Sequence, residues 1–199
     1  MKVIAHPEGE SLRRRIKIQP QLFQPWKGTV YRVTTLTYPD PQSILLGEGS
    51  FRYGGRWNAS GSFRAVYGST EDTVAVAESR ANAEYAGMPY PFRTPRLLVT
   101  IELSLRRVLD LSLEQVRKDL DISLEILNQD WRKIQDQGQE GFTQALGRAV
   151  FENGGEGLLA PSARVRSGVN VVYFPENKRE ASLARVYESE KLDQLIPHA

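Results

Sequence analysis

The sequence contains no cysteine and only two histidines, His6 and His198, which lie near its two ends. Without cysteine the chain cannot form disulfides, thiolate nucleophiles or cysteine–zinc sites. Chain ends are usually mobile, so we expect no Ser-His-Asp triad, no histidine metal site and no imidazole base. Any chemistry must therefore come from carboxylates, arginines, tyrosines and hydroxyl groups, without a bound metal.

The 199-residue sequence also has no apolar run long enough to span a bilayer, and its start, MKVIAHPEGE, has no apolar signal-peptide region. We therefore expect a cytoplasmic protein without membrane contact, and the lack of cysteine fits a reducing compartment. Hydrophobic residues make up 40% of the chain, enough for the core of one domain. The net charge of +2 favours an anionic small molecule but is too small to indicate nucleic acid.

The order of predicted elements indicates the fold class. β-branched and aromatic runs predict strands at residues 29–36, 65–67, 96–103, 157–160, 169–174 and 184–191, with 108–111 continuing the third strand or forming the next. Helical spacing predicts helices at 71–86, 112–135 and 143–152, and glycine and proline predict loops at 38–49, 51–58 and 87–95. Strands and helices do not alternate regularly. The order therefore predicts a single α+β domain with a mixed, mostly antiparallel sheet and flanking helices.

Residues 1–28 are predicted to be an N-terminal extension, and residues 29–199 the main domain. Three prolines punctuate the extension, and residues 11–19, SLRRRIKIQ, are basic. We interpret this basic segment as a solvated edge strand or arm. A nucleic-acid-binding tail is the alternative.

The most informative stretch covers residues 53–79, YGGRWNASGSFRAVYGSTEDTVAVAES. Gly54 and Gly55 permit backbone conformations closed to residues with a side chain, and Arg56 follows them directly. Tyr67 lies in a predicted short strand, and Glu78 lies in a predicted helix among apolar neighbours. A cation, an aromatic ring and a carboxylate suit phosphate groups, flat rings and developing positive charge.

Several segments, in order along the chain, resemble the RES domain family, the toxin half of RES–Xre toxin–antitoxin pairs. They are Tyr31-Arg32, GGRWN at 54–58, VYGS at 66–69, AVAE at 75–78, TQALG at 143–147, LLAPSA at 158–163, Asn170, and YFP at 173–175. The resemblance covers roughly residues 29–174. The combination of segments is specific, whereas each segment alone is weak.

The resemblance implies a fold similar to ADP-ribosyltransferases and activity on NAD as substrate. The nicotinamide–ribose bond would be cleaved by hydrolysis or phosphorolysis, or ADP-ribose would be transferred to a protein. It also implies a Xre-like helical antitoxin that covers the active site. A different class of function is a non-catalytic nucleotide-binding module, with an RNA contact through residues 13–17. The acceptor and the oligomeric state, including a homo-oligomer, stay open.

Two arginines are the predicted clamp for the NAD pyrophosphate, because guanidinium groups make planar, bidentate contacts with phosphate oxygens. Arg56 follows Gly54 and Gly55, which would allow the backbone to approach the pyrophosphate closely. Arg32, on the neighbouring predicted strand, is the second candidate and matches the arginine of the family.

Glu78 is the predicted catalytic carboxylate, which would stabilise an oxocarbenium-like ribose or hold its hydroxyls. Tyr67 would stack on nicotinamide or pack in the core. Ser162 would hydrogen-bond to ribose, nicotinamide or an attacking phosphate, and without a neighbouring histidine it is not expected to be an activated nucleophile. We interpret the remaining polar and aromatic candidates as structural, with Asn58 and Asn170 in loops and turns and Trp57 and Trp131 in the core.

Overall fold

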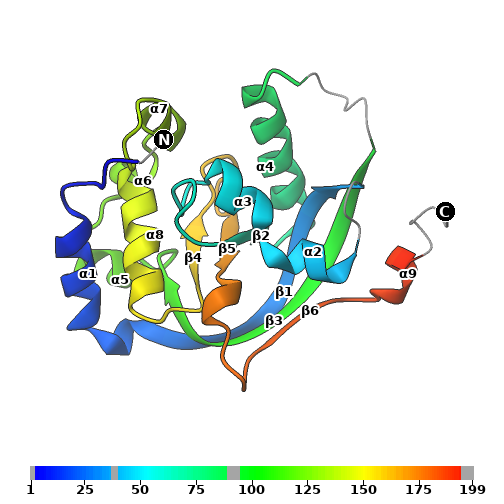
Figure 1. The fold of residues 1–199 in the computed structure, drawn as a ribbon. Helices are drawn as coiled ribbons and strands as arrows, with labels where there is room; N and C mark the ends of the chain where they lie inside the picture. The colour runs from blue at the N-terminus through cyan, green and yellow to red at the C-terminus, as the bar shows by residue number, and fades with distance from the viewer. Residues whose placement is uncertain (1–2, 37–39, 89–94, 194–199) are drawn as a thin grey trace.

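A computed structural model describes residues 3–36, 40–88 and 95–193, and it shows helices packed around a central sheet (Figure 1). His198 and most of the predicted connection at 87–95 lie outside the described residues. Among the described residues, no helix is long and apolar enough to cross a membrane. The same residues contain no cluster of three or more histidine, aspartate or glutamate side chains that could hold a metal ion.

The sheet has six strands in the order β1-β2-β5-β4-β3-β6, and β1 also pairs with β3. The pairings between the first five strands therefore close into a ring, with β6 added at one edge of β3. Among the paired strands of the described residues, only β3 and β4 run parallel. The strands are β1 Phe23–Thr35, β2 Val66–Ser69, β3 Arg96–Asp110, β4 Gly157–Pro161, β5 Val169–Tyr173 and β6 Leu183–Val186. This arrangement confirms the predicted α+β class and its mostly antiparallel sheet.

The two long strands β1 and β3 pair with each other over nearly their whole length. β3 is continuous, so the predicted segments 96–103 and 108–111 belong to one strand. β1 begins at Phe23, earlier than predicted, and so runs through position 28. The predicted last strand is shorter than expected, because β6 ends at Val186 and helix α9, Glu190–Asp193, follows.

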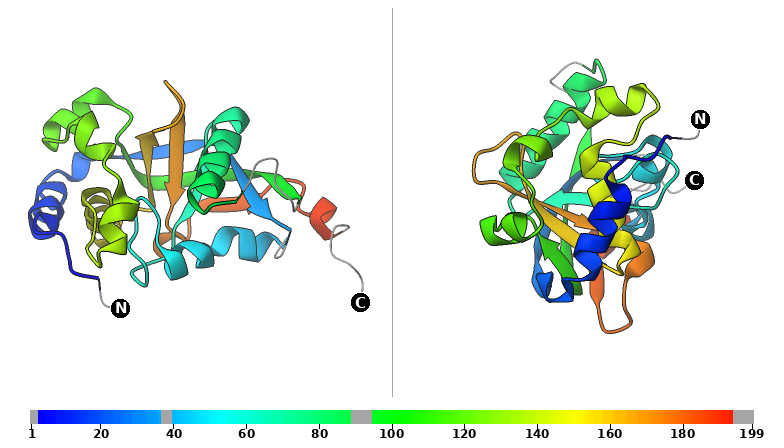
Figure 2. Two further views of the ribbon diagram at one scale, coloured as in Figure 1. Left: turned by 90° about the horizontal axis from the view of Figure 1, so that it is seen from above. Right: turned by 90° about the vertical axis from the view of Figure 1, so that its left-hand side faces the viewer.

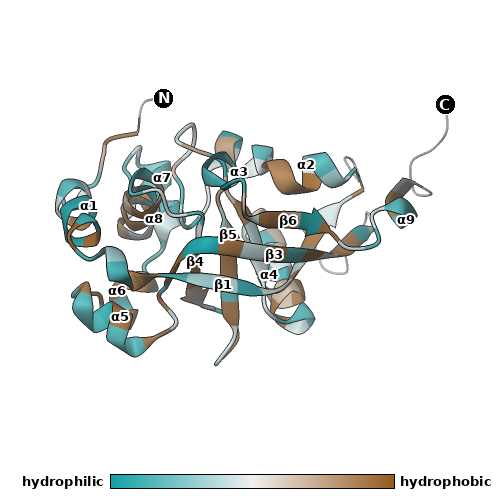
Figure 3. Cartoon of the chain, turned by 90° about the horizontal axis from the view of Figure 1, so that it is seen from below, coloured by the Kyte–Doolittle hydropathy of each residue, from teal (hydrophilic) through white to brown (hydrophobic). Residues whose placement is uncertain are grey.

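The basic N-terminal segment is a helix, α1 Gly9–Lys17, so its interpretation as an edge strand was wrong. Leu12 and Ile16, four residues apart, lie on one face of α1 and are fully buried. This face packs on helix α8, Phe142–Glu152, and Figures 1 and 2 show the two helices side by side. Figure 3 shows α1 with both hydrophilic and hydrophobic colours, as an amphipathic helix requires.

The predicted loop at 38–49 contains helix α2, Pro41–Leu46, and the start of α3, Glu48–Tyr53. Asp40 caps α2, because its Oδ1 accepts a hydrogen bond of 2.8 Å from the Ser43 amide. Gly47 then separates the two helices with a φ of 73°, a left-handed conformation that favours glycine. Pro41, at the start of α2, and Gly47, at its end, are therefore helix start and stop signals.

The predicted long helix at 112–135 is also wrong, because the segment forms three short helices. They are α5 Glu114–Asp119, α6 Leu124–Leu127 and α7 Trp131–Asp136. Asp121, with a φ of 53°, lies between α5 and α6. The side chains of Ser123 and Asp130 cap α6 and α7, respectively. Helix α4, Asp72–Tyr85, and helix α8 agree with the predicted helices at 71–86 and 143–152.

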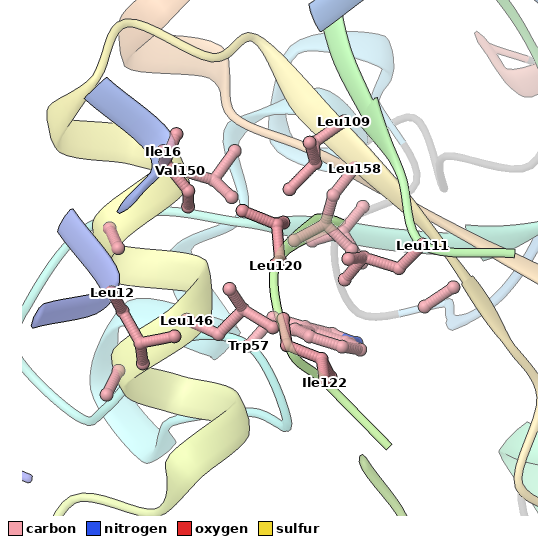
Figure 4. Close-up of a cluster of buried hydrophobic side chains, with 14 of the residues drawn as sticks. Leu12, Ile16, Trp57, Leu109, Leu111, Leu120, Ile122, Leu146, Val150 and Leu158 are labelled. Carbon is pink, nitrogen blue, oxygen red and sulfur yellow. The ribbon is translucent and has the colours of Figure 1, made fainter. Parts of the chain in front are cut away.

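The main hydrophobic core lies between α1, α8, the segment 116–127 and one face of the sheet. Figure 4 shows part of this cluster, which includes Trp57, Leu120, Leu146 and Leu158. Trp57 is 2% exposed, which confirms its predicted place in the core. The core therefore fixes the position of the loop that carries Arg56.

Candidate active site

A cleft of about 720 Å³ opens between β1, β2, α4, the 54–57 loop and the α6–α7 segment. Six of the seven predicted site residues line it, namely Arg32, Gly54, Gly55, Arg56, Tyr67 and Glu78. Ser162 is outside the lining but contacts Glu78 directly. The fold therefore brings together residues that lie up to 130 positions apart in the sequence.

The Glu78 carboxylate is held by two side chains at one of its oxygens. The hydroxyl of Ser162 and the amide Nδ2 of Asn170 each donate to Glu78 Oε1 at 2.7 Å. Ser69 donates to Asn170 Oδ1 at 2.8 Å, which fixes the orientation of the amide. Within the described ranges, Glu78 Oε2 accepts no hydrogen bond. One oxygen is therefore anchored, and the other is left for a ligand.

Ser162 acts on Glu78 from the loop that follows β4. Its Oγ accepts hydrogen bonds of 3.1 Å from the amides of Arg164 and Val165, so its proton is directed to Glu78. A hydroxyl with both kinds of partner already in place is poorly suited to act as a nucleophile. The contact of Ser162 with ribose, nicotinamide or phosphate stays a prediction.

The loop between α3 and β2 is organised around the hydroxyl of Tyr67. This hydroxyl accepts from the Trp57 amide at 2.9 Å and donates to Asn58 Oδ1 at 2.6 Å. Asn58 is fully buried and also donates to the carbonyls of Ser50 and Phe63. Burial raises the pKa of Tyr67, so the phenol stays neutral and keeps its donor. Asn58 therefore has the structural role that the sequence predicted.

The two glycines of the loop are required by contacts inside the protein. A side chain at Gly55 would place its Cβ 2.4 Å from the Tyr67 hydroxyl. Gly54 has a φ of 77°, and a Cβ there would lie 2.1 Å from the side-chain oxygen of Gln135. These contacts explain why glycine is required at both positions. The predicted close approach of this backbone to the pyrophosphate stays a prediction.

Helix α8 braces the same loop from behind, which explains the TQALG motif. The fully buried Gln144 donates to the Gly55 carbonyl at 3.0 Å and to the Gln135 side chain at 2.8 Å. A Cβ at Gly147 would lie 1.9 Å from the Trp57 carbonyl oxygen, so only glycine lets α8 approach so closely. This packing fixes the position of the Arg56 backbone.

The two predicted phosphate-binding arginines are half-buried and lack carboxylate partners within ion-pair distance among the residues described. Arg32 donates to the Tyr67 carbonyl at 2.7 Å, and Arg56 donates to the Leu127 carbonyl and to Asn128. Burial lowers the pKa of both guanidinium groups, and the charge of Glu78 partly offsets this shift for Arg56. Each Nε atom is buried without a hydrogen-bond partner. Both groups therefore have unused capacity for an anion.

Sequence reasoning did not assign several residues of the cleft to the site. Asn170 contacts Glu78 and so has more than a turn role, and Trp131 is a partly exposed residue of the lining rather than part of the core. Arg132 and Arg164 also line the cleft. Asn170 is among the segments that resemble the RES family, but its contact with Glu78 could not be predicted, because its partner Ser69 lies on another strand.

The charges in the cleft favour an anionic ligand that also carries a positive centre. Five arginines line the cleft, namely Arg32, Arg56, Arg96, Arg132 and Arg164. Glu78 is the carboxylate anchored by side chains from β5 and the loop after β4. Burial and the neighbouring charge of Arg164 lower the pKa of Arg132, as expected for cations gathered in one place. Such a cleft can bind phosphate groups and stabilise positive charge that develops beside one carboxylate.

Comparisons with known proteins agree with this geometry. The model of the RES domain matches residues 29–194. The chain is 30% identical, over 157 residues, to the NAD(+) phosphorylase MbcT of Mycobacterium bovis and of Mycobacterium tuberculosis, covering 77% of this chain and 76% of each relative. The crystal structure of the M. tuberculosis MbcT–MbcA toxin–antitoxin complex matches with a TM-score of 0.66 and 25% identity. That match covers 94% of this chain and 97% of the other.

Proposed function

This chain belongs to the RES domain family, and from that premise we propose that it is an enzyme that consumes NAD by cleaving the nicotinamide–ribose bond. The observation that carries the proposal is the Glu78 carboxylate, anchored at Oε1 by Ser162 and Asn170 in a cleft lined by arginines. The similarity to a relative named NAD(+) phosphorylase supports the same substrate.

The proposed reaction needs a group that stabilises positive charge on ribose. As the glycosidic bond breaks, its electron pair leaves with the nicotinamide nitrogen, and positive charge develops at the ribose carbon. The Glu78 carboxylate offsets this charge, and its free Oε2 accepts a ribose hydroxyl. Arg32 and Arg56 contact the pyrophosphate through their planar guanidinium groups. Tyr67 presents its ring to the nicotinamide side.

For the acceptor we propose inorganic phosphate rather than water. A phosphate oxygen forms the new bond to the ribose carbon as nicotinamide leaves, so the products are nicotinamide and ADP-ribose carrying a phosphate on that carbon. The name of the relative and the excess of arginines in the cleft support this choice. The test is product analysis with and without phosphate. ADP-ribose as the sole product at saturating phosphate would instead support hydrolysis.

Transfer of ADP-ribose to a protein is the second enzymatic candidate, and a nucleotide-binding module is a non-enzymatic one. Incubation with labelled NAD separates them, because free nicotinamide without a labelled protein supports degradation. Label on a protein supports transfer, and unchanged NAD supports the module. The RNA contact proposed for residues 13–17 is weakened by internal pairing, since Arg13 pairs with Glu10 and Arg15 with Glu8.

We further propose that the chain acts in the cytoplasm as a toxin and that a helical, Xre-like antitoxin neutralises it. A toxin–antitoxin complex among the solved relatives supports an antitoxin partner. The arginines of the cleft would accept an anionic group of that partner, such as a terminal carboxylate. Expression of the chain alone should lower cellular NAD and stop growth, and co-expression with the product of the neighbouring gene should restore both. Normal growth and NAD with the folded chain alone would contradict the toxin role.

A further inference from the structure

The far end of the cleft contains an aromatic cluster that the proposed chemistry does not use. The guanidinium carbon of Arg132 lies 4.6 Å from the ring centre of Tyr85 and 4.5 Å from that of Trp131. The same guanidinium contacts the side chain of Asn82, and the Tyr85 hydroxyl lies 3.2 Å from Asp136 Oδ2. These contacts join α4 to α7. All three members of the Tyr85–Arg132–Trp131 cluster line the cleft.

Helix α4 places this cluster at a defined distance from Glu78. Glu78, Asn82 and Tyr85 are spaced by four and three residues, so they follow one face of the helix. Seven residues of helix correspond to about 10 Å along its axis. One helix face therefore carries the carboxylate at one end and an aromatic ring two turns away.

The cluster combines exposed ring surface with positive charge. Tyr85 is 51% exposed and Trp131 is partly exposed, although aromatic rings are usually buried. No carboxylate within ion-pair distance of Arg132 appears in the described part of the chain. Its side chain is instead held by the two ring faces and by Asn82. Partly exposed aromatic rings beside a cation are suited to stacking a nucleobase next to a phosphate.

We propose that the Tyr85–Arg132–Trp131 cluster binds the adenine base of the dinucleotide, with the base stacked on Trp131. The inference rests on the proposed function, because cleavage at Glu78 places nicotinamide at one end of the cleft. Adenine then lies at the other end, separated from it by two riboses and the pyrophosphate. Arg132 is a positioning residue that holds the rings of Tyr85 and Trp131. The cluster thereby selects a dinucleotide over a mononucleotide.

The first test measures binding without catalysis. AMP and ribose 5-phosphate share a sugar and a phosphate and differ in the base, so calorimetric titration with both compounds isolates the contribution of adenine. We expect the wild type to bind AMP more tightly. Trp131→Ala should weaken AMP binding about tenfold or more, the loss typical of one base–aromatic stack, and leave ribose 5-phosphate unaffected. Trp131→Phe, which keeps a ring, should retain most of the AMP affinity.

The second test uses the reaction and separates the inference from the proposed function. Trp131→Ala should lower kcat/KM for NAD relative to nicotinamide mononucleotide, which has no adenine, by about tenfold. Equal loss for both substrates, or equal loss of AMP and ribose 5-phosphate binding, would indicate a structural role and overturn the inference. Failure of the wild type to bind AMP would also overturn it. AMP binding that depends on Trp131, without any nicotinamide release, would support the inference and contradict the proposed function.

Discussion

Glu78 and Glu156 are two carboxylates that accept internal hydrogen bonds, and they differ in how many of their oxygens are occupied. Glu156 is fully buried, and both of its oxygens accept bonds from backbone amides, those of Arg106, Arg107 and Arg179. Glu78 lines an open cleft, and side chains bond only one of its oxygens.

The two environments differ in their effect on the ionisation of the carboxylate and on its ability to bind a ligand. Burial opposes the charge of Glu156, but the amide bonds, that of Arg179 foremost, hold its pKa below the ordinary value of 4.5. A carboxylate with both oxygens bonded to backbone amides stabilises the fold and leaves neither oxygen free for a substrate. A carboxylate anchored at one oxygen keeps its orientation and still presents the other. The predictions below test this contrast.

The largest expected effect is on catalysis by Glu78→Gln. The substitution keeps size but removes the charge that stabilises the ribosyl centre, so nicotinamide release should fall about 10²–10³-fold. Thermal unfolding should give a Tm close to that of the wild type. Glu84→Gln is the matched control, because Glu84 lies on the same helix, outside the cleft lining and exposed. A turnover of Glu78→Gln close to that of the wild type would contradict the catalytic role proposed for Glu78.

Glu156→Gln should have the opposite profile. An amide nitrogen would face a backbone N–H that now bonds a carboxylate, so urea unfolding should show a loss of about 2–3 kcal/mol. Nicotinamide release per folded molecule should stay close to the wild-type value. If catalysis falls while stability is unchanged, the contrast between the two carboxylates is wrong.

Arg32→Ala and Arg56→Ala should chiefly weaken substrate binding. Pyrophosphate contacts hold substrate and transition state alike, so KM for NAD should rise about 10-fold or more while kcat changes less. Arg56→Lys should restore only part of the affinity, since an ammonium lacks the planar fork. Arg14→Ala, an exposed site on α1, serves as control. Wild-type affinity in both alanine variants would place the pyrophosphate elsewhere.

Ser162→Ala should have a smaller effect, because it removes one of the two bonds to Glu78 and leaves the charge. We expect kcat to fall about tenfold, as for a modest misplacement of a catalytic group. Ser62→Ala removes a hydroxyl outside the cleft lining and should leave kcat unchanged. A loss in Ser162→Ala as large as that in Glu78→Gln would instead point to direct participation of the hydroxyl.

The smallest expected effect is a pH dependence of stability from Glu156. A carboxylate whose folded-state pKa is depressed contributes stability above its unfolded-state pKa, and that contribution disappears as the pH falls through the folded value. The free-energy difference between wild type and Glu156→Gln should therefore be largest at neutral pH and shrink in acid. A difference that stays constant from neutral to acidic pH would show that folding does not lower the pKa of Glu156.

Glu78 could be selected as a candidate from the sequence because its apolar neighbours distinguish it from the solvated glutamates of the same helix. The structure places Glu78 in the cleft lining, and its catalytic role stays a prediction. It could also predict the α+β class, since β-branched runs alternate irregularly with helical segments. The register of β2 against β5 could not be predicted, and this register places Ser69 beside Asn170, whose amide donates to Glu78. The division of residues 112–135 into three helices depends on the left-handed backbone of Asp121 and on two side-chain caps. The spacing of hydrophobic residues does not indicate these features.

The most direct test of the central claim is one time course with the purified wild-type chain, NAD and inorganic phosphate. Nicotinamide and the ribosyl product are quantified together, and circular dichroism confirms that the protein is folded. The account predicts that NAD disappears while nicotinamide and a ribosyl phosphate appear in equal amounts. NAD that remains intact in the presence of the folded chain would contradict it.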